Sequence, residues 1–211
     1  MAAELEEGAC IRPAAHAHSC PPIAPRQQLV PRIPSTASPI HSLSLESHSH
    51  RWGEPPSYDP APTVAFLRVV IDELVSAHGG DRQRVTLAGF SCGAIAAWHV
   101  GLYDDTVAAL WRSFLVYAHC DGEYIGPYPD GPINVTQRLA RLRGRPSFVC
   151  NCDVADEKAK VLALCPESGG ACDGLEWSDT PFRNHNDQWV LRPSAERAAL
   201  REWWARTLAS L

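Results

Sequence analysis

The chain has 211 residues, of which 45% are hydrophobic and 20% charged, and it carries a formal net charge of −5. This length is sufficient for one domain with a substantial core. The negative charge offers no basic surface for nucleic acid, and the longest nearly apolar run, residues 88–103, is too short to cross a bilayer. We therefore expect a soluble protein that neither binds nucleic acid nor spans a membrane.

The beginning of the chain differs from the rest. Residues 1–45 are rich in Pro, Ser, Ala and His and show neither a helical nor an alternating period of apolar residues. Repeated prolines remove backbone donors and fix φ. We expect residues 1–45 to form a disordered tail and residues 46–211 to form the folded domain. Organellar targeting stays open, because residues 8–45 contain arginines and no acidic residue, whereas three glutamates precede them.

Helix and strand signals alternate from residue 59 onward. The expected elements, in chain order, are a helix through residues 64–75, a strand at 84–89, a buried helix at 94–103, a strand at 113–119, a helix at 134–144, a strand at 147–152, a helix at 157–165, a fourth strand at 174–178 and an amphipathic helix at 194–211. This alternation is typical of a parallel sheet with helices on both faces. The predicted fold class is α/β, with a doubly wound parallel sheet.

Eight cysteines allow either disulfides or reduced thiols. Cys150 and Cys152 fall on one face of an expected strand and cannot easily bridge each other. The overall pattern does not resemble a disulfide framework, which favours reduced thiols and a cytoplasmic location. Cys165 and Cys172 flank a flexible loop and could pair if the protein is exported. The spacing of the cysteines lacks the turn of a zinc site, so we expect neither a metal nor a cofactor.

The most specific motif is Gly89-Phe90-Ser91-Cys92-Gly93, which fits G-x-S-x-G. It lies between an expected strand and an expected helix, which is the context of a nucleophile elbow. We expect both glycines to be required, because side chains there would collide with the neighbouring strand and helix. Such a turn raises the Ser91 hydroxyl above the carboxyl edge of the sheet, where the helix directs its N–H groups. The alternative is a small residue in an ordinary turn.

A serine hydroxyl needs a base to act as a nucleophile, and the base needs an acid to orient it. His185 lies in a loop before the last helix and is the predicted base. Asp156 follows the third strand and is the predicted acid, with Asp153, directly after that strand, as the alternative. His119 also ends a strand at this edge, and we interpret it as part of a pocket wall or a turn.

The segment DRQRVTLAGFSCGA, residues 81–94, resembles the elbow of short carboxylesterases, thioesterases and polyester-depolymerase-type esterases in the α/β-hydrolase superfamily. The resemblance covers about residues 59–211. It implies an acyl-enzyme on Ser91, with the backbone N–H of Cys92 as one oxyanion donor. It also implies several strands ahead of the elbow, for which too few residues are present, so we expect a sheet that is incomplete on its N-terminal side.

The leading functional hypothesis is a serine hydrolase that cleaves carboxylic esters or thioesters without a cofactor. One alternative is a catalytically inactive hydrolase remnant that acts as a binding module. Another is a serine peptidase of the same superfamily. Because the elbow strand has few strands available on one side, we also expect exposed apolar surface and self-association.

Overall fold

The computed structural model describes residues 60–121, 131–166, 169–182, 185–186 and 188–210. The expected tail at residues 1–45, and the expected start of the domain at residue 46, lie outside the described residues.

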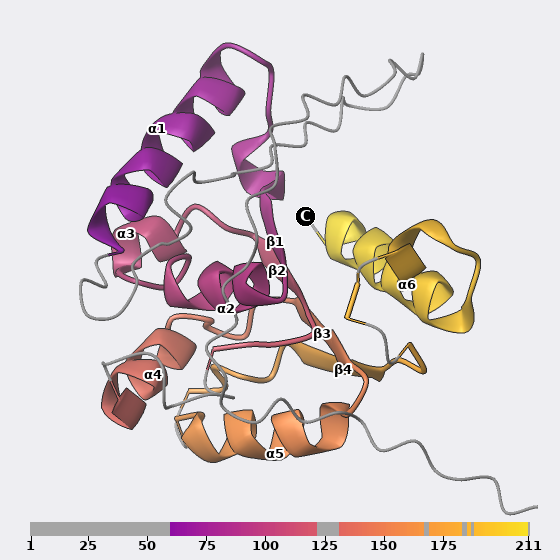
Figure 1. The fold of residues 1–211 in the computed structure, drawn as a ribbon. Coiled ribbons are helices and arrows are strands. Elements are labelled where there is room, and N and C mark those ends of the chain that lie inside the picture. Colours follow the sequence, from indigo (N-terminus) through magenta and orange to yellow (C-terminus); the bar gives the residue numbers. More distant parts are fainter. Residues whose placement is uncertain (1–59, 122–130, 167–168, 183–184, 187, 211) are drawn as a thin grey trace, which may run out of the picture.

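In the described part of the chain, four parallel strands form a single sheet in the order β1-β2-β3-β4 (Figure 1). Their bounds are β1 Thr86–Phe90, β2 Ser113–Tyr117, β3 Ser147–Asn151 and β4 Leu175–Asp179. The predicted α/β class and the parallel sheet are therefore confirmed. The order of the described strands follows the chain without a reversal, so a doubly wound sheet of the hydrolase type stays a prediction.

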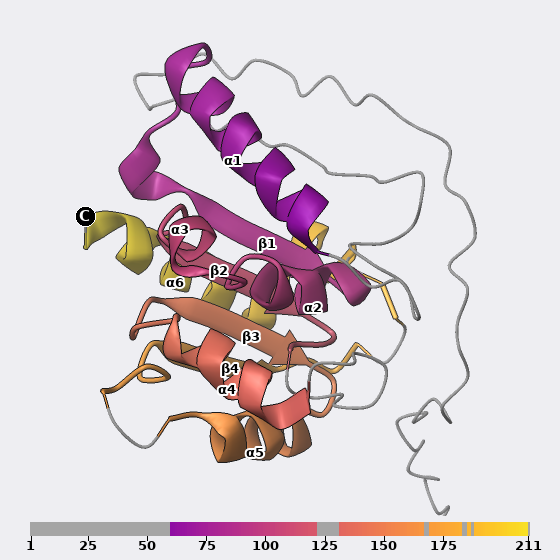
Figure 2. The ribbon, with the colours of Figure 1, turned by 90° about the vertical axis from the view of Figure 1, so that its left-hand side faces the viewer.

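Helices cover both faces of this sheet. They are α1 Ala61–Ser76, α2 Cys92–His99, α3 Asp105–Ala108, α4 Gly131–Ala140, α5 Val154–Leu164 and α6 Ala195–Ala209, with short 3₁₀ turns η1 Arg82–Arg84 and η2 Gln188–Leu191. Helices α1 to α5 lie on one face and α6 lies on the other, as the two perpendicular views show (Figures 1 and 2). Because β1 to β4 succeed one another along the sheet, the connections through α2, α4 and α5 all pass over the same face.

Two groups of buried side chains hold the layers together. The larger group joins α1, α2, α4 and α5 to the sheet, and its fully buried members include Trp98, Phe114 and Leu139. The smaller group lies under α6, where Phe148 of β3 packs against Trp203 with ring centroids 5.6 Å apart. Strands β2 and β3 are thus covered on both faces, which accounts for their nearly continuous apolar sequences.

Helix α3 was not expected from the sequence. It spans only four residues, Asp105–Ala108, too few to show a helical period. Asp104 caps it by accepting a hydrogen bond from the Val107 N–H at 2.8 Å. The same carboxylate binds Arg68 of α1 at 2.7 Å, so one aspartate starts α3 and joins it to α1. Burial acts to raise the pKa of Asp104, but its hydrogen bonds and the charge of Arg68 lower the pKa below the ordinary value.

Cys165, at the end of α5, forms a disulfide with Cys172, which precedes β4. The structure therefore adopts the pairing that the sequence left open, and reduced thiols are not the state of these two residues. Cys120 and Cys150 are buried, and Cys152 is partly exposed. Among the described residues, no helix is both long and apolar enough to cross a bilayer.

Candidate active site

Ser91 connects β1 directly to α2 and has an unusual backbone conformation. Its φ is 57° and its ψ is −127°, a region that residues with a side chain rarely adopt. The turn is held by two backbone hydrogen bonds of 2.9 Å, from the Ser91 N–H to the Tyr117 carbonyl and from the Ala94 N–H to the Ser91 carbonyl. The Ser91 hydroxyl does not cap α2, although serine often does so at this position. The hydroxyl therefore lies at the carboxyl end of β1 and can form a hydrogen bond with a group outside α2.

The two motif glycines have different roles. A Cβ atom on Gly89 would lie 2.1 Å from the carbonyl oxygen of Gly93, so no side chain fits there. A Cβ atom on Gly93 would have no neighbouring atom within 4 Å. The expected collision is therefore confirmed at Gly89 and wrong at Gly93. The crowding arises because β1 passes close to the backbone of the first turn of α2, and at Gly93 the side-chain direction points to open space.

His185 meets Ser91 across 94 positions of the chain. Its Nε2 lies 2.7 Å from the Ser91 hydroxyl oxygen, a normal length for a hydrogen bond. The imidazole ring also contacts Phe90, with ring centroids 4.9 Å apart, and His119, at 5.6 Å. Phe90 ends β1 and His119 follows β2, so residues at the ends of two strands frame the histidine. The structure brings together the predicted nucleophile and base.

The predicted acid lies near the same edge but is not established by its contacts. Asp156 is in the first turn of α5, where its carboxylate forms an ion pair with Lys160 at 3.0 Å. The alternative acid, Asp153, precedes α5 and is exposed, and its side chain makes no capping hydrogen bond. Both carboxylates follow β3, at the carboxyl end of the sheet. The structure establishes the serine–histidine pair and leaves the acid a prediction.

Cys92 is the first residue of α2, directly after Ser91. The N–H groups in the first turn of a helix have no acceptor within that helix, and they carry the positive end of its dipole. An oxygen that gains negative charge beside Ser91 could accept a hydrogen bond from such a group. The position of Cys92 is thus compatible with the predicted oxyanion donor.

A buried carboxylate next to the site was not predicted from the sequence. Asp121, in the segment after β2, accepts hydrogen bonds from Arg138 of α4 at 2.5 and 3.2 Å, and its carboxylate lies 3.8 Å from Nδ1 of His99. All three side chains are at most 5% exposed. Burial acts to raise the pKa of Asp121, but its interactions with His99 and Arg138 outweigh the burial and lower that pKa. The network fixes the segment that carries His119.

A second buried carboxylate orders the segment after β3. Glu157 is 1% exposed and accepts a hydrogen bond from the side chain of Asn151 at 3.1 Å. This contact ties the end of β3 to the first turn of α5, where Asp156 lies. Burial and the charge of Glu157 together raise the pKa of the Cys150 thiol, so Cys150 stays protonated and is a poor nucleophile. Within the described residues no group of three or more His, Cys, Asp or Glu side chains is arranged to hold a metal ion.

The unequal roles of the two glycines give a matched pair of variants. Gly89→Ala should destabilise the fold by about 3 kcal/mol or more, because its methyl group would overlap the Gly93 carbonyl. Gly93→Ala should be neutral or stabilise α2 by about 0.5–1 kcal/mol, since alanine is the better helix former. Urea denaturation measures both effects. Equal losses in the two variants would contradict the geometry described for the elbow.

Removing the charge of Asp121 should strongly destabilise the protein. Asp121→Asn leaves Arg138 buried without its carboxylate, which should cost about 3–5 kcal/mol at neutral pH. Because the native pKa of Asp121 is below its ordinary value, the stability that this group adds is present at neutral pH and is lost as the pH falls through that native pKa. The difference between wild type and variant should therefore shrink in acid. Asp72→Asn, at an exposed ion pair, is the control and should cost less than about 1 kcal/mol.

Similarity to known proteins does not add to this description. No protein-family model, no curated protein and no solved structure matches the chain. The family resemblance of residues 81–94 therefore stays an expectation. A function has to be argued from the geometry around Ser91 and His185.

Proposed function

We propose that the protein is a serine hydrolase of α/β-hydrolase type that cleaves carboxylic esters or thioesters. The observation that carries this proposal is the 2.7 Å contact between His185 Nε2 and the Ser91 hydroxyl, at a serine held in a strained turn. Strained backbone persists only where the surrounding structure enforces it, and such residues cluster at functional sites. A strained backbone at Ser91 is not expected if the residue lies in an ordinary turn. A histidine within hydrogen-bond distance of that serine is not expected in an inactive remnant.

In the proposed reaction, the neutral His185 accepts the proton of the Ser91 hydroxyl through Nε2 while the oxygen attacks the substrate carbonyl. The carbonyl oxygen becomes negatively charged and accepts a hydrogen bond from the Cys92 N–H. His185 then donates its proton to the departing alcohol or thiol, which leaves an acyl group on Ser91. A water molecule, deprotonated by His185, then attacks the acyl carbon, the bond from that carbon to the Ser91 oxygen breaks, and His185 returns the proton to the serine as the carboxylic acid leaves.

The acid in this scheme orients His185 and stabilises its positive charge. We assign this role to Asp156, which lies in the first turn of α5 at the carboxyl end of β3. Asp156 forms an ion pair with Lys160, and both side chains of this pair are exposed. Such a pair contributes little stability, so it opposes the proposed role of Asp156 only weakly. Asp153 is the second candidate, because it is exposed at the same edge.

A fluorophosphonate probe tests the nucleophile and the base, because it labels only activated serines. Wild-type protein should be labelled at Ser91, and Ser91→Ala should abolish labelling. His185→Ala should slow labelling by at least about 10³-fold, because without a base the hydroxyl keeps its proton. Intact-mass spectrometry and peptide mapping report the site and the rate. Absence of labelling in a sample with cooperative unfolding would refute the hydrolase.

The same assay distinguishes the two acids. Asp156→Asn should slow labelling by about 10²–10⁴-fold, whereas Asp153→Asn should change the rate by less than about threefold. The reverse pattern would keep the mechanism and transfer the role to Asp153. Turnover of a series of acyl esters and thioesters then defines the substrate class, with Ser91→Ala as the blank.

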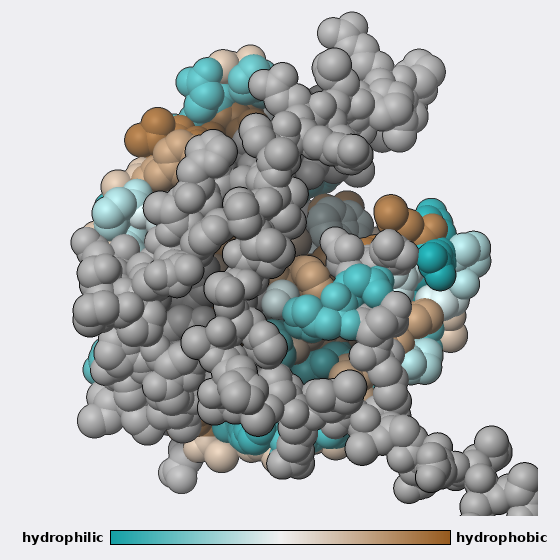
Figure 3. Space-filling model, viewed as in Figure 1, coloured by the Kyte–Doolittle hydropathy of each residue, from teal (hydrophilic) through white to brown (hydrophobic). Residues whose placement is uncertain are grey.

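The proposal also includes self-association. Strand β1 forms one edge of the described sheet, and unpaired strand edges readily pair with another chain. On α1, Phe66 and Val69 are 51% and 67% exposed, and hydrophobic surface is visible over this helix (Figure 3). Sedimentation velocity of the full chain should show a dimer that Phe66→Ser with Val69→Ser weakens. A monomer at all concentrations would contradict this part of the proposal.

A further inference from the structure

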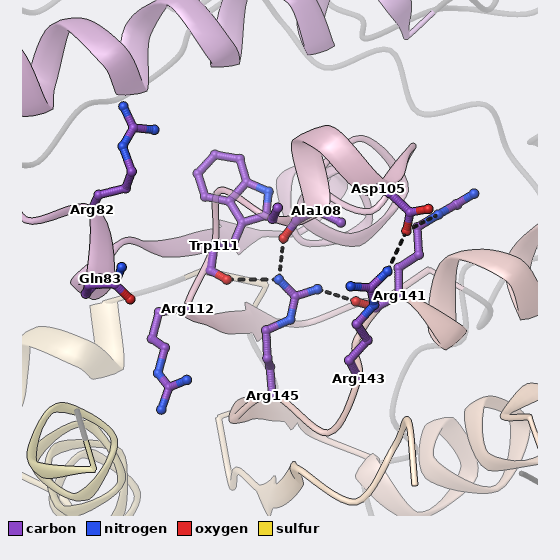
Figure 4. Close-up of a pocket in the computed structure, with 10 residues that line it drawn as sticks. Arg82, Gln83, Asp105, Ala108, Trp111, Arg112, Arg141, Arg143 and Arg145 are labelled. Carbon is purple, nitrogen blue, oxygen red and sulfur yellow. Dashed lines mark hydrogen bonds and ion pairs between the residues drawn. The ribbon is translucent and has the colours of Figure 1, made fainter. Parts of the chain in front are cut away.

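A pocket lies at the opposite end of the sheet from Ser91. It has a volume of about 330 Å³, and arginines dominate its walls (Figure 4). Three of its residues lie in segments that lead into strands: Arg82 and Gln83 belong to η1, ahead of β1, and Arg112 directly precedes β2. The pocket is therefore at the amino ends of the strands, whereas Ser91 follows the carboxyl end of β1. It shares no residue with the candidate active site.

Positive charge in this pocket exceeds negative charge. Its walls contain five arginines, Arg82, Arg112, Arg141, Arg143 and Arg145, and one carboxylate, that of Asp105. Asp105 accepts a hydrogen bond from Arg143 at 2.9 Å and lies 3.7 Å from Arg141. Arg82 pairs with Asp72, outside the pocket, at 2.5 Å. Arg112 and Arg145 form no ion pair with a carboxylate among the described residues, although the whole chain carries a net charge of −5.

Arg145 is a fixed positive charge at the centre of this cluster. Its guanidinium donates a hydrogen bond to the carbonyl group of Leu142 at 2.8 Å. It also donates hydrogen bonds to the carbonyl groups of Trp111, at 2.9 Å, and of Ala108 and Arg141 (Figure 4). These neutral partners hold the side chain without cancelling its charge. Burial, followed by the charges of Arg143 and Arg112, lowers the pKa of Arg145 to about 10. Arg145 is therefore still cationic at neutral pH, in a place where its neighbours repel it.

Arg112 retains unused hydrogen-bonding capacity. Its guanidinium makes one long hydrogen bond, 3.4 Å, to the Ser210 carbonyl, and its Nε is buried without an acceptor among the described residues. A buried donor without a partner is unfavourable, and so is the repulsion between Arg112 and Arg145. An anion between these side chains would relieve the repulsion.

We propose that this pocket binds a small molecule that carries a phosphate or diphosphate group, with Arg112 and Arg143 as its ligands and Arg145 as the fixed charge behind them. Phosphate oxygens match the planar donors of guanidinium groups, which often bind them through two hydrogen bonds. The concave shape and the limited volume fit a small anion. A polynucleotide would meet an excess of negative charge over the rest of the molecule.

Anion binding by this pocket does not depend on ester cleavage and is measured separately. The full chain is titrated with inorganic phosphate and with pyrophosphate by calorimetry, with sodium chloride added to keep the ionic strength constant. We expect saturable binding of one anion per chain, with a Kd of about 1 mM or below and tighter binding of pyrophosphate. Thermal unfolding should move to higher temperature with pyrophosphate and not with chloride of equal ionic strength.

Variants locate the site. Arg112→Gln should weaken pyrophosphate binding by about tenfold or more, and Arg143→Gln should also weaken it. Arg145 is left unchanged, because its bonds to four carbonyl groups make it part of the fold. Arg201→Gln removes the same charge from an exposed position on α6 and is the control, expected to change the Kd by less than about twofold.

Three results would overturn the proposal. The first is the absence of saturable binding of phosphate and pyrophosphate. The second is an equal effect of Arg112→Gln and Arg201→Gln, which would show general attraction by charge. The third is binding of a single-stranded oligonucleotide in preference to pyrophosphate, which would assign the arginines to nucleic acid. None of these results bears on the labelling of Ser91.

Discussion

The candidate active site depends on the close approach of β1 to the first turn of α2. A backbone can come this near to another only where a side chain is absent, and Gly89 provides that position, with its missing Cβ 2.1 Å from the Gly93 carbonyl. The approach leaves one residue, Ser91, to reverse the direction of the chain, which explains its positive φ of 57°. The backbone consequently directs the Ser91 side chain away from α2 at the carboxyl end of β1.

The parallel sheet determines what surrounds that hydroxyl. Since all four strands point the same way, every segment that leaves a strand emerges at the Ser91 edge. His119 leaves β2, Asp153 and Asp156 leave β3, and His185 follows β4. The segments that enter strands gather at the other edge, where arginines precede β1, β2 and β3. One topology thus separates the Ser91–His185 contact from a pocket of fixed positive charge.

Much of this arrangement could be predicted from the sequence, because it depends on local patterns. The strands at residues 84–89, 113–119 and 147–152 have short apolar runs, and the pairing of Ser91 with His185 follows from a motif and from chain order. The buried carboxylates were missed, because nothing in a local pattern tells that Asp121 will face Arg138 in the core. The arginine pocket was missed for the same reason, since its walls come from residues 82–145. Gly93 was misjudged, since its side-chain direction depends on how α2 lies against β1.

The position of the elbow in the sheet has a further consequence. Strand β1 is bonded to β2 on one side only among the described strands, and Ala88 is exposed there. Two contacts on the β2 side hold the Ser91 turn in place. The Ser91 N–H binds the Tyr117 carbonyl at 2.9 Å, and the rings of Phe90 and Tyr117 stack with their centroids 5.3 Å apart. Tyr117 in turn packs against Trp189 of η2, which follows the His185 loop. Tyr117 thus contacts the Ser91 turn directly and, through Trp189, the segment that follows His185, so both partners of the 2.7 Å contact lie close to this tyrosine.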